Sequence, residues 1–227
     1  MRIDGAIFDV DGTLLDSMFV WNNIGEDYLL SRGIKSRENL NKTFEYMSIL
    51  QSAQYYQSEY GLKDSTDEIV NGINKMIARF YMEEAKLKDG VKEFLESLHK
   101  NGIQMCVATA TDRHLIEPAL KRTGIAQYFS EIFTCTSVGF GKDNPTIYLK
   151  ALEHLKTKKE NTFVFEDALY AIKTAKNIGF NVVGVHDKVE IINQHEIKNL
   201  VDLYINSFSE MSEYLDEKSF NNSRIRL

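Results

Sequence analysis

Two aspartates, Asp9 and Asp11, follow a short apolar run near the amino terminus, in the segment AIFDVDG. Side chains alternate along an extended strand, so the two carboxyl groups can point to the same side. When two carboxyl groups lie so near each other, the charge on one makes the other harder to ionise. Either a Mg²⁺ ion lies between the oxygens, or one Asp attacks a substrate while the other carries a proton. A plain Asp-Gly turn is the alternative without chemistry.

A second acidic pair, Glu166 and Asp167, ends the apolar run FVF. Two adjacent carboxylates at the end of a buried strand are costly unless a cation meets them. Asp167 could instead serve only as the N-cap of the helix expected after it. The choice between these interpretations depends on which groups accompany the acids.

Phosphate chemistry would need hydroxyl, backbone N–H and cationic partners, and Thr109 and Lys142 are candidates. Thr109 follows an apolar run and precedes an expected helix, where a hydroxyl and backbone N–H groups can cradle a phosphate. Lys142 lies in the glycine-containing loop GFGKDNP, and a cation there could stabilise a phosphoryl transition state. The alternatives are a threonine-capped loop and an ordinary surface charge.

The elements expected to position these residues alternate between strand and helix. Apolar runs predict strands, and helical periodicity closed by glycine predicts the helices between them. Pro118 suggests that one helix begins late or is kinked. Besides the first run, strands are predicted over 103–108, 132–136, 162–165, 181–185 and 203–205, and helices over 91–100, 115–122, 146–155, 168–177 and 209–215, followed by a polar, fraying tail over 216–227.

Between the first strand and this alternation, residues 16–86 carry only helical patterns. Helices are expected over 17–30, 44–60 and 66–84. The predicted fold is therefore α/β, with a Rossmann-like parallel sheet flanked by helices and a small all-α domain inserted into it. The predicted core is 1–15 plus 87–227.

Composition narrows the class of protein. The chain has 227 residues, of which 43% are hydrophobic and 26% charged, with a net charge of −6. Its one short basic run, 156–159, is expected to be a solvated turn, so a nucleic-acid partner is not expected. No apolar run approaches the ~18 residues of a membrane span, and no signal peptide is recognised.

The two cysteines, Cys106 and Cys135, both lie in strand-like runs and are expected to be reduced and buried, with a disulfide as the lesser alternative. Reduced cysteines favour a location in the cytoplasm.

The segment DVDGTLLDS, which begins at Asp9, resembles the first motif of the haloacid dehalogenase superfamily. Thr109 matches the second motif, Lys142 the third, and the pair Glu166 and Asp167 the fourth. The resemblance covers essentially the whole chain and includes subgroups with a helical cap, both phosphatases and enzymes like β-phosphoglucomutase.

One departure concerns the third motif. Relatives commonly have KPxPxxY/F, whereas this chain has KDNPTIY, so Asp143 replaces the first proline. The substitution affects the expected shape of the loop but leaves its lysine in place.

The resemblance implies a set of roles for the acidic residues. Asp9 would be the nucleophile that forms an aspartyl phosphate, and Asp11 the general acid and base. Mg²⁺ would be held by the Asp9 carboxylate, the Asp11 backbone carbonyl and Asp167, with Glu166 as a further ligand or orienting group.

Thr109, the Ala110 N–H and Lys142 would bind the transferring phosphate. An Asp at position 11 argues for phosphate esters, because relatives that cleave carbon–halogen or carbon–phosphorus bonds typically lack it. The predicted function is thus a Mg²⁺-dependent phosphomonoester hydrolase that acts on a small phosphorylated metabolite. The partners expected are this metabolite alone, with the protein a monomer or weak homo-oligomer. A non-catalytic regulator that binds a phosphorylated ligand is an alternative.

In such relatives the insert is a cap that closes over the site and selects the substrate. Aromatic and Met side chains at helical spacing belong more often to a domain's own core than to a pocket. With few charged groups among its candidates, this cap favours a small, modestly polar phosphomonoester. The candidates are Trp21, Phe44, Tyr46, Met47, Ser48, Ile49, Gln51, Ser52, Tyr55 and Tyr56.

A sugar phosphomutase is the second alternative, because β-phosphoglucomutases share the four motifs and a similar cap. Those enzymes carry a His that tunes the proton-handling Asp, where this chain has Trp21. They also carry a cap Arg that grips the distal phosphate of a bisphosphate, where this chain has Ile49. An aliphatic side chain cannot supply the paired donors of Arg. We therefore predict a phosphatase without useful mutase activity.

Overall fold

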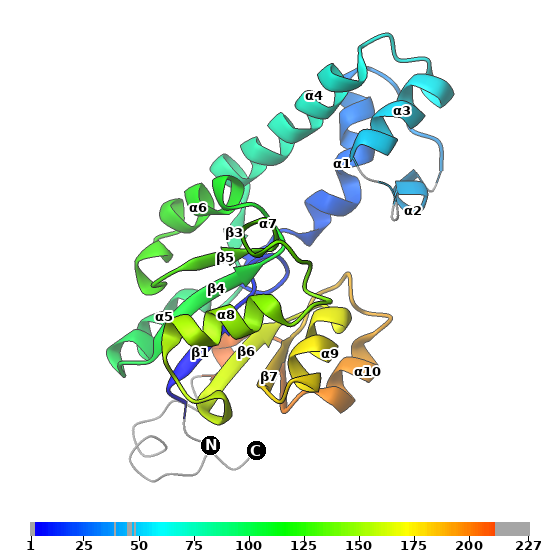
Figure 1. Cartoon of the computed structure of the whole chain (residues 1–227). Coiled ribbons are helices and arrows are strands. Elements are labelled where there is room, and N and C mark those ends of the chain that lie inside the picture. The colour runs from blue at the N-terminus through cyan, green and yellow to red at the C-terminus, as the bar shows by residue number, and fades with distance from the viewer. Residues whose placement is uncertain (1–2, 39, 45–46, 48, 212–227) are drawn as a thin grey trace. The chain divides into compact units, whose positions relative to one another are not determined.

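The computed structural model describes residues 3–38, 40–44, 47 and 49–211 (Figure 1). The chain divides into two compact units. The first, here called the core, comprises Met1–Asp16 and Lys86–Leu227, and the second, called the cap, comprises Ser17–Ala85. These limits lie one residue from those expected from the sequence.

A six-stranded sheet with the order β5-β4-β1-β6-β7-β8 forms the centre of the core. Every pairing in it is parallel, which confirms the predicted α/β class. The first strand lies in the middle, and its last residue, Phe8, is opposite Val107 on one side and Phe165 on the other. The strands are β1 (Gly5–Phe8), β4 (Gln104–Thr109), β5 (Ile132–Thr134), β6 (Thr162–Glu166), β7 (Asn181–Val185) and β8 (Leu203–Ile205).

Helices connect these strands. The helices of the core are α5 (Val91–Lys100), α6 (Arg113–Arg122), α7 (Cys135–Val138), α8 (Thr146–Leu155), α9 (Leu169–Asn177) and α10 (Gln194–Leu200), with short 3₁₀ helices η2 (Ala126–Tyr128), η3 (Lys159–Asn161) and η4 (Phe208–Met211). The helix expected over 209–215 is the 3₁₀ turn η4 as far as the described residues extend; the rest of it, and the tail over 216–227, lie outside them.

Alternation along the strands gives the core two apolar layers. Ile7 and Val164 belong to a buried cluster that includes residues of α8, α9 and α10. Phe8 and Phe165 point the other way, and their rings stack with centroids 4.5 Å apart. Phe94 of α5 packs edge-on against both rings. Burying side chains of this size contributes about 1.5–3 kcal/mol each, so both faces hold the central strands in place.

Two predictions about the core's elements were wrong. The strand expected over 132–136 ends at Thr134, whose side chain accepts a hydrogen bond from the N–H of Ser137 and begins α7. Cys135 is therefore helical and only partly buried. The helix expected over 115–122, for which Pro118 suggested a late start or a kink, does not begin late: it begins at Arg113 and contains the proline.

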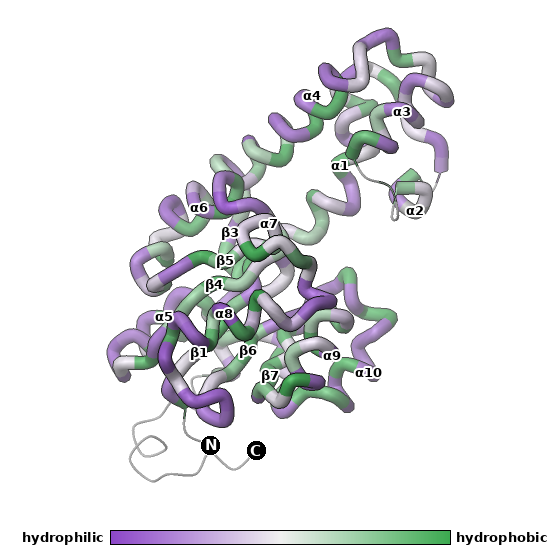
Figure 2. The backbone as a smooth tube through the Cα atoms, in the orientation of Figure 1, coloured by the Kyte–Doolittle hydropathy of each residue, from purple (hydrophilic) through white to green (hydrophobic). Residues whose placement is uncertain are grey.

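The cap consists of helices, namely α1 (Met18–Ser31), α2 (Leu40–Phe44), α3 (Ile49–Tyr60), α4 (Thr66–Arg79) and the π-helical turn η1 (Phe80–Glu84). Of the helix expected over 44–60, Ile49–Tyr60 forms α3 and Phe44 is the last residue of α2, while Met47 between them is not helical. Tyr46 and Ser48, two of the candidate pocket residues, lie outside the described residues. A capping box between Ser65 and Glu68 begins α4, and Figure 2 shows the alternation of polar and apolar residues along it.

Aromatic side chains form the interior of the cap. Tyr56 is buried, donates a hydrogen bond from its hydroxyl to the Gly25 carbonyl at 2.8 Å, and lies with its ring 5.1 Å from that of Phe44. The Trp21 indole N–H donates to the Tyr81 hydroxyl at 3.0 Å. Several residues considered for a pocket thus contribute to the cap's own packing.

Two short strands, β2 (Leu15–Asp16) and β3 (Lys86–Leu87), pair antiparallel where the chain leaves and re-enters the core. The sequence predicted only a link here, since two residues are too few to show a periodicity. Among the described residues, no helix is both long and apolar enough to cross a membrane.

Candidate active site

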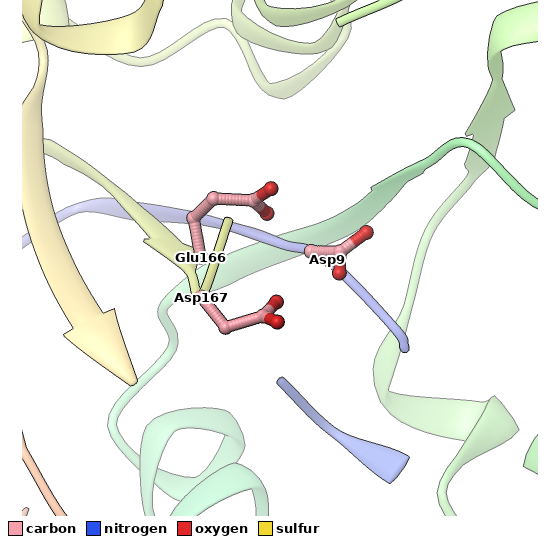
Figure 3. A group of neighbouring side chains, drawn as sticks. All are labelled: Asp9, Glu166 and Asp167. Atoms are coloured by element: carbon pink, nitrogen blue, oxygen red, sulfur yellow. The ribbon is translucent and has the colours of Figure 1, made fainter. Parts of the chain in front are cut away.

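The carboxyl ends of β1 and β6 bring three acids together. Asp9 directly follows β1, and its backbone N–H donates to the Phe165 carbonyl at 3.0 Å, which continues the pairing of the two strands. Glu166 is the last residue of β6, and Asp167 follows it. One carboxylate oxygen from each acid lies within 4.8 Å of the others, and all three side chains are buried (Figure 3).

Lys142 is the direct cationic partner of two of these acids. Its ammonium group donates to Asp9 Oδ1 and to Glu166 Oε1 and Oε2, the last two at 3.2 and 3.0 Å. The side chain is only 3% exposed, so it is not the solvated charge of the alternative interpretation. The loop with Asp143 in place of proline thus delivers its lysine to the acids.

Burial dominates the electrostatics of the acidic cluster. It raises the pKa of Asp9, against the opposing effect of the Lys142 ammonium. Burial and the neighbouring Asp9 raise the pKa of both Glu166 and Asp167 well above their usual values. Burial would lower the pKa of Lys142, but the Asp9 and Glu166 carboxylates raise it well above its usual value.

This charge balance fits a divalent cation. Three ionised carboxylates and one ammonium leave two negative charges in a buried space. Mg²⁺ prefers carboxylate and carbonyl oxygens as ligands, and the described donors are oxygens. The residues therefore fit the expected ion, which the cluster could hold.

Asp167 has a partner that the sequence interpretation did not single out. The Thr13 hydroxyl donates to Asp167 Oδ1 at 3.0 Å, and Thr13 is completely buried. This bond joins the loop after β1 to the residue after β6. Thr13 belongs to the DGT segment, so the motif itself was the available signal.

Lys88, also absent from the sequence predictions, supports the loop after β1. Its ammonium group donates to the carbonyls of Gly12 and His186, the latter at 2.6 Å, and pairs with Asp187 Oδ2 at 2.8 Å. Its backbone N–H donates to the Leu14 carbonyl at 2.9 Å. Gly12 has a φ of +80°, which favours glycine at this turn.

Asp11 and Thr109 meet through a third residue, Thr111. The Thr111 hydroxyl donates to Asp11 Oδ2 at 2.7 Å, and the Thr111 N–H donates to Thr109 Oγ1 at 3.2 Å. Thr109 is buried as the last residue of β4, and Ala110 beside it is exposed. Every predicted site residue therefore lies at the carboxyl edge of the sheet or in a loop that reaches it.

The cysteines take no part in this arrangement as ligands. Cys106 and Cys135 are both free thiols, as predicted. Cys106 is buried, and burial raises its pKa; Cys135 is only partly buried, which corrects the expectation for it.

The comparison with known families decides the chain's relationship. Residues 6–185 match the family described as haloacid dehalogenase-like hydrolases. The chain belongs to this family. The match includes the segments that carry Asp9, Thr109, Lys142 and Asp167, and the expected membership of the haloacid dehalogenase superfamily is confirmed.

The sequence of this hydrolase is less than 30% identical to those of the two relatives described next. It is 27% identical over 177 residues to a phosphorylated carbohydrates phosphatase of Thermotoga maritima, across 78% of this chain and 82% of the relative. It is 28% identical over 204 residues to (DL)-glycerol-3-phosphatase 2 of Arabidopsis thaliana, across 85% and 83%. Its structure resembles that of a putative β-phosphoglucomutase from Thermotoga maritima, with a TM-score of 0.81, 25% identity and coverage of 95% and 99%.

Proposed function

We propose that this hydrolase is a Mg²⁺-dependent phosphomonoesterase that acts on a small phosphorylated metabolite through an aspartyl-phosphate intermediate. The observation that carries the proposal is the buried group of Asp9, Lys142, Glu166 and Asp167 at the end of the central strands. The phosphatase class agrees with the names of the relatives.

The chemistry divides between the two aspartates of the first motif. An Asp9 oxygen attacks phosphorus, the phosphorus–oxygen bond of the ester breaks, and the alkoxide leaves. Asp11 gives a proton to that alkoxide and later takes one from the water that hydrolyses the aspartyl phosphate. Asp11 is 9% exposed, so surrounding protein shields most of its side chain.

The remaining residues bind the phosphoryl group. The Lys142 ammonium, the Thr109 hydroxyl and the Ala110 N–H are the proposed donors to its oxygens. When bound, Mg²⁺ would be held by Asp9, Asp167 and the Asp11 carbonyl, with Glu166 as a ligand or orienting group. It would supply positive charge at the phosphoryl oxygens.

For the substrate, we infer a small sugar or polyol phosphate. The relatives named above are a phosphatase of phosphorylated carbohydrates and a phosphatase of glycerol 3-phosphate. The proposal includes a cytoplasmic location and a monomeric or weakly associated protein.

A sugar phosphomutase is the second candidate, because one structural neighbour is named a putative β-phosphoglucomutase. Two cap residues favour hydrolysis. Trp21 stands at the position expected for the His of the mutases and is engaged with Tyr81. Ile49, at the position of the mutases' phosphate-binding Arg, has no donors to offer.

The test is turnover of p-nitrophenyl phosphate and of a panel of sugar, polyol and pyrophosphate substrates, with Mg²⁺ and with chelator. Asp9→Asn should abolish turnover while its circular dichroism stays that of the wild type. Asp27→Asn, which changes an exposed aspartate of α1, is the matched control and should stay active. Undiminished activity of Asp9→Asn would remove the nucleophile from the proposal.

The mutase alternative needs its own measurement. Orthophosphate should be released from small sugar or polyol phosphates. Conversion of β-glucose 1-phosphate to glucose 6-phosphate, stimulated by the 1,6-bisphosphate and faster than hydrolysis, would favour the mutase instead.

A further inference from the structure

A side-chain hydrogen bond joins the loops after β1 and β4, and none of the roles proposed above involves it. Phe8 and Val107 are paired residues on these neighbouring parallel strands, so the backbone leaves the sheet at the same edge after each strand. Beyond that edge the Thr111 hydroxyl donates to Asp11 Oδ2 at 2.7 Å. The two residues are 100 positions apart in sequence, so the bond depends on the sheet having formed.

The backbone fixes Thr111 with respect to β4. Its N–H donates to the Thr109 hydroxyl oxygen at 3.2 Å, and Thr109 is 1% exposed and paired with Thr134 in the sheet. A hydroxyl has one donor hydrogen and two acceptor lone pairs. Thr109 therefore accepts from Thr111 while its own O–H remains a donor for a phosphoryl oxygen.

The proposed proton transfer requires the Asp11 carboxyl group to have a defined orientation. Asp11 lies on a turn that Gly12 makes with a φ of +80°, and a carboxyl group on a turn has rotatable bonds that neighbouring residues must fix. Misplacing a catalytic group by about 1 Å can cost about 10²-fold in rate. Two hydrogen bonds connect the sheet to the Asp11 carboxyl group, from Thr111 N–H to Thr109 Oγ1 and from the Thr111 hydroxyl to Asp11 Oδ2.

We propose that Thr111 is a positioning residue that orients the Asp11 carboxyl group for proton transfer to the leaving alkoxide. The inference rests on the proposed function, and it adds a residue that the four motifs do not assign. It links the proposed phosphate-binding Thr109 to the proposed proton carrier, so both are placed by one short segment after β4. A mere tie between two loops is the competing interpretation.

If Thr111 orients Asp11, the loss of rate on removing its hydroxyl should depend on the leaving group of the substrate. If Thr111 only ties two loops together, that loss should be the same for every substrate. The alkoxide of an alkyl phosphate is a strong base and needs a proton as it leaves, whereas p-nitrophenolate leaves without one. Because kcat/KM compares the transition state with free enzyme and substrate, it reports the steps up to departure of the alcohol. It therefore excludes the later hydrolysis of the aspartyl phosphate, for which Asp11 is also needed.

The experiment measures kcat/KM for glycerol phosphate and for p-nitrophenyl phosphate in the full chain with Mg²⁺. Thr111→Val removes the hydroxyl at nearly constant shape, and Thr111→Ser keeps it. Thr123→Val is the matched control, because Thr123 is also partly buried and donates its hydroxyl to the Ala119 carbonyl at 2.7 Å, in the last turn of α6.

General acid catalysis contributes about 10²–10⁴-fold, so Thr111→Val should lower kcat/KM for glycerol phosphate by about 10–100-fold. For p-nitrophenyl phosphate the loss should stay within about threefold. Thr111→Ser should restore both values, and Thr123→Val should match the wild type. Equal losses on the two substrates, or no loss on either, would overturn the proposal.

Two checks keep the outcome decisive. If Thr111→Val does not fold, as judged by circular dichroism, Thr111→Ala takes its place with the same expected ratio. Failure of the proposed function looks different, because the wild type would then not hydrolyse p-nitrophenyl phosphate or Asp9→Asn would remain active. In that case the inference about Thr111 falls with it.

Discussion

Mg²⁺ should stabilise the fold itself, and Asp167→Asn should remove that stabilisation. In the protein without metal, the three buried carboxylates and the Lys142 ammonium, which contacts Asp9 and Glu166, carry two net negative charges. The Lys88 ammonium also acts on Asp167, but it is paired with the Asp187 carboxylate. A divalent cation cancels the two remaining charges, whereas a monovalent salt cannot. A ligand that binds only the folded state at ~100 times its Kd adds about 2.7 kcal/mol.

That free energy translates into a measurable shift. For a chain of this length each kcal/mol raises Tm by about 2–4 °C, so saturating Mg²⁺ should raise Tm by about 5–10 °C over the protein in chelator. The assay is thermal unfolding followed by circular dichroism, with NaCl at matched ionic strength as the reference.

The pH dependence has a definite sign. Burial raises the pKa values of Asp9, Glu166 and Asp167 in the fold. A group whose folded pKa is raised stabilises the fold fully below its unfolded pKa, near 4 for these acids. That stabilisation is lost as the pH rises through the folded pKa. Chelated protein should therefore lose stability as the pH rises from about 4, while Mg²⁺, which binds the ionised carboxylates, should stabilise more at about pH 8 than at about pH 5.

Asp167→Asn separates the charge from the contact. The amide oxygen can still accept from the Thr13 hydroxyl, but one ligand and one buried charge are removed. In chelator at about pH 8 its Tm should equal or exceed that of the wild type, and Mg²⁺ should shift it by less than about 2 °C. Asp27→Asn should keep the full shift. An undiminished shift in Asp167→Asn, or none in the wild type, would refute this account of the cluster.

Three further outcomes are expected. Lys142→Met should lower turnover of p-nitrophenyl phosphate about 10²–10³-fold at saturating Mg²⁺, and steady-state kinetics showing a loss under tenfold would exclude Lys142 from transition-state stabilisation. Lys88→Met should cost about 3–5 kcal/mol in urea unfolding by leaving Asp187 buried without its cation, with partial recovery in the double variant with Asp187→Asn; additive losses would mean no coupling. Gly90→Ala should lower the free energy of unfolding, measured in urea, by about 1–3 kcal/mol, because φ is +76° and the new Cβ would clash with the Ser209 backbone nitrogen; an unchanged free energy of unfolding would contradict this.

Much of the core was predictable because its strands are short apolar runs and glycine ends several of the helices between them. Residues 181–185 and 203–205 form strands as predicted. Helix α10 was missed because its sequence QHEIKNL buries only Ile197, which is too little for a visible apolar stripe. The strand predicted past Thr134 failed because a hydroxyl cap, and not hydrophobicity, decides where α7 begins.

The acids and Lys142 could be located because their residue types at strand ends are unusual enough to suggest chemistry. Lys88 and Thr111 could not, since a lysine or threonine in a loop is ordinary until the fold gives it a partner. Thr13 stands in the first motif, but its contact with Asp167 likewise becomes visible only in the fold. Their contacts join segments far apart in the chain, such as Lys88 with Asp187. Pairings of this kind depend on tertiary structure, which residue type and spacing do not encode.

The pairing of Asp16 with Lys86 affects the entropy that the core loses when it closes the chain around the cap. The cap leaves and rejoins the core at residues held one strand spacing apart, about 4.8 Å. To the core, residues 17–85 are therefore the loop of a hairpin, and the entropy of closing a loop grows only with the logarithm of its length. Inserts of different size or fold could be exchanged at this junction at a cost of little more than ~0.6 kcal/mol per doubling of length, while Asp9, Lys142 and Glu166 keep their mutual contacts.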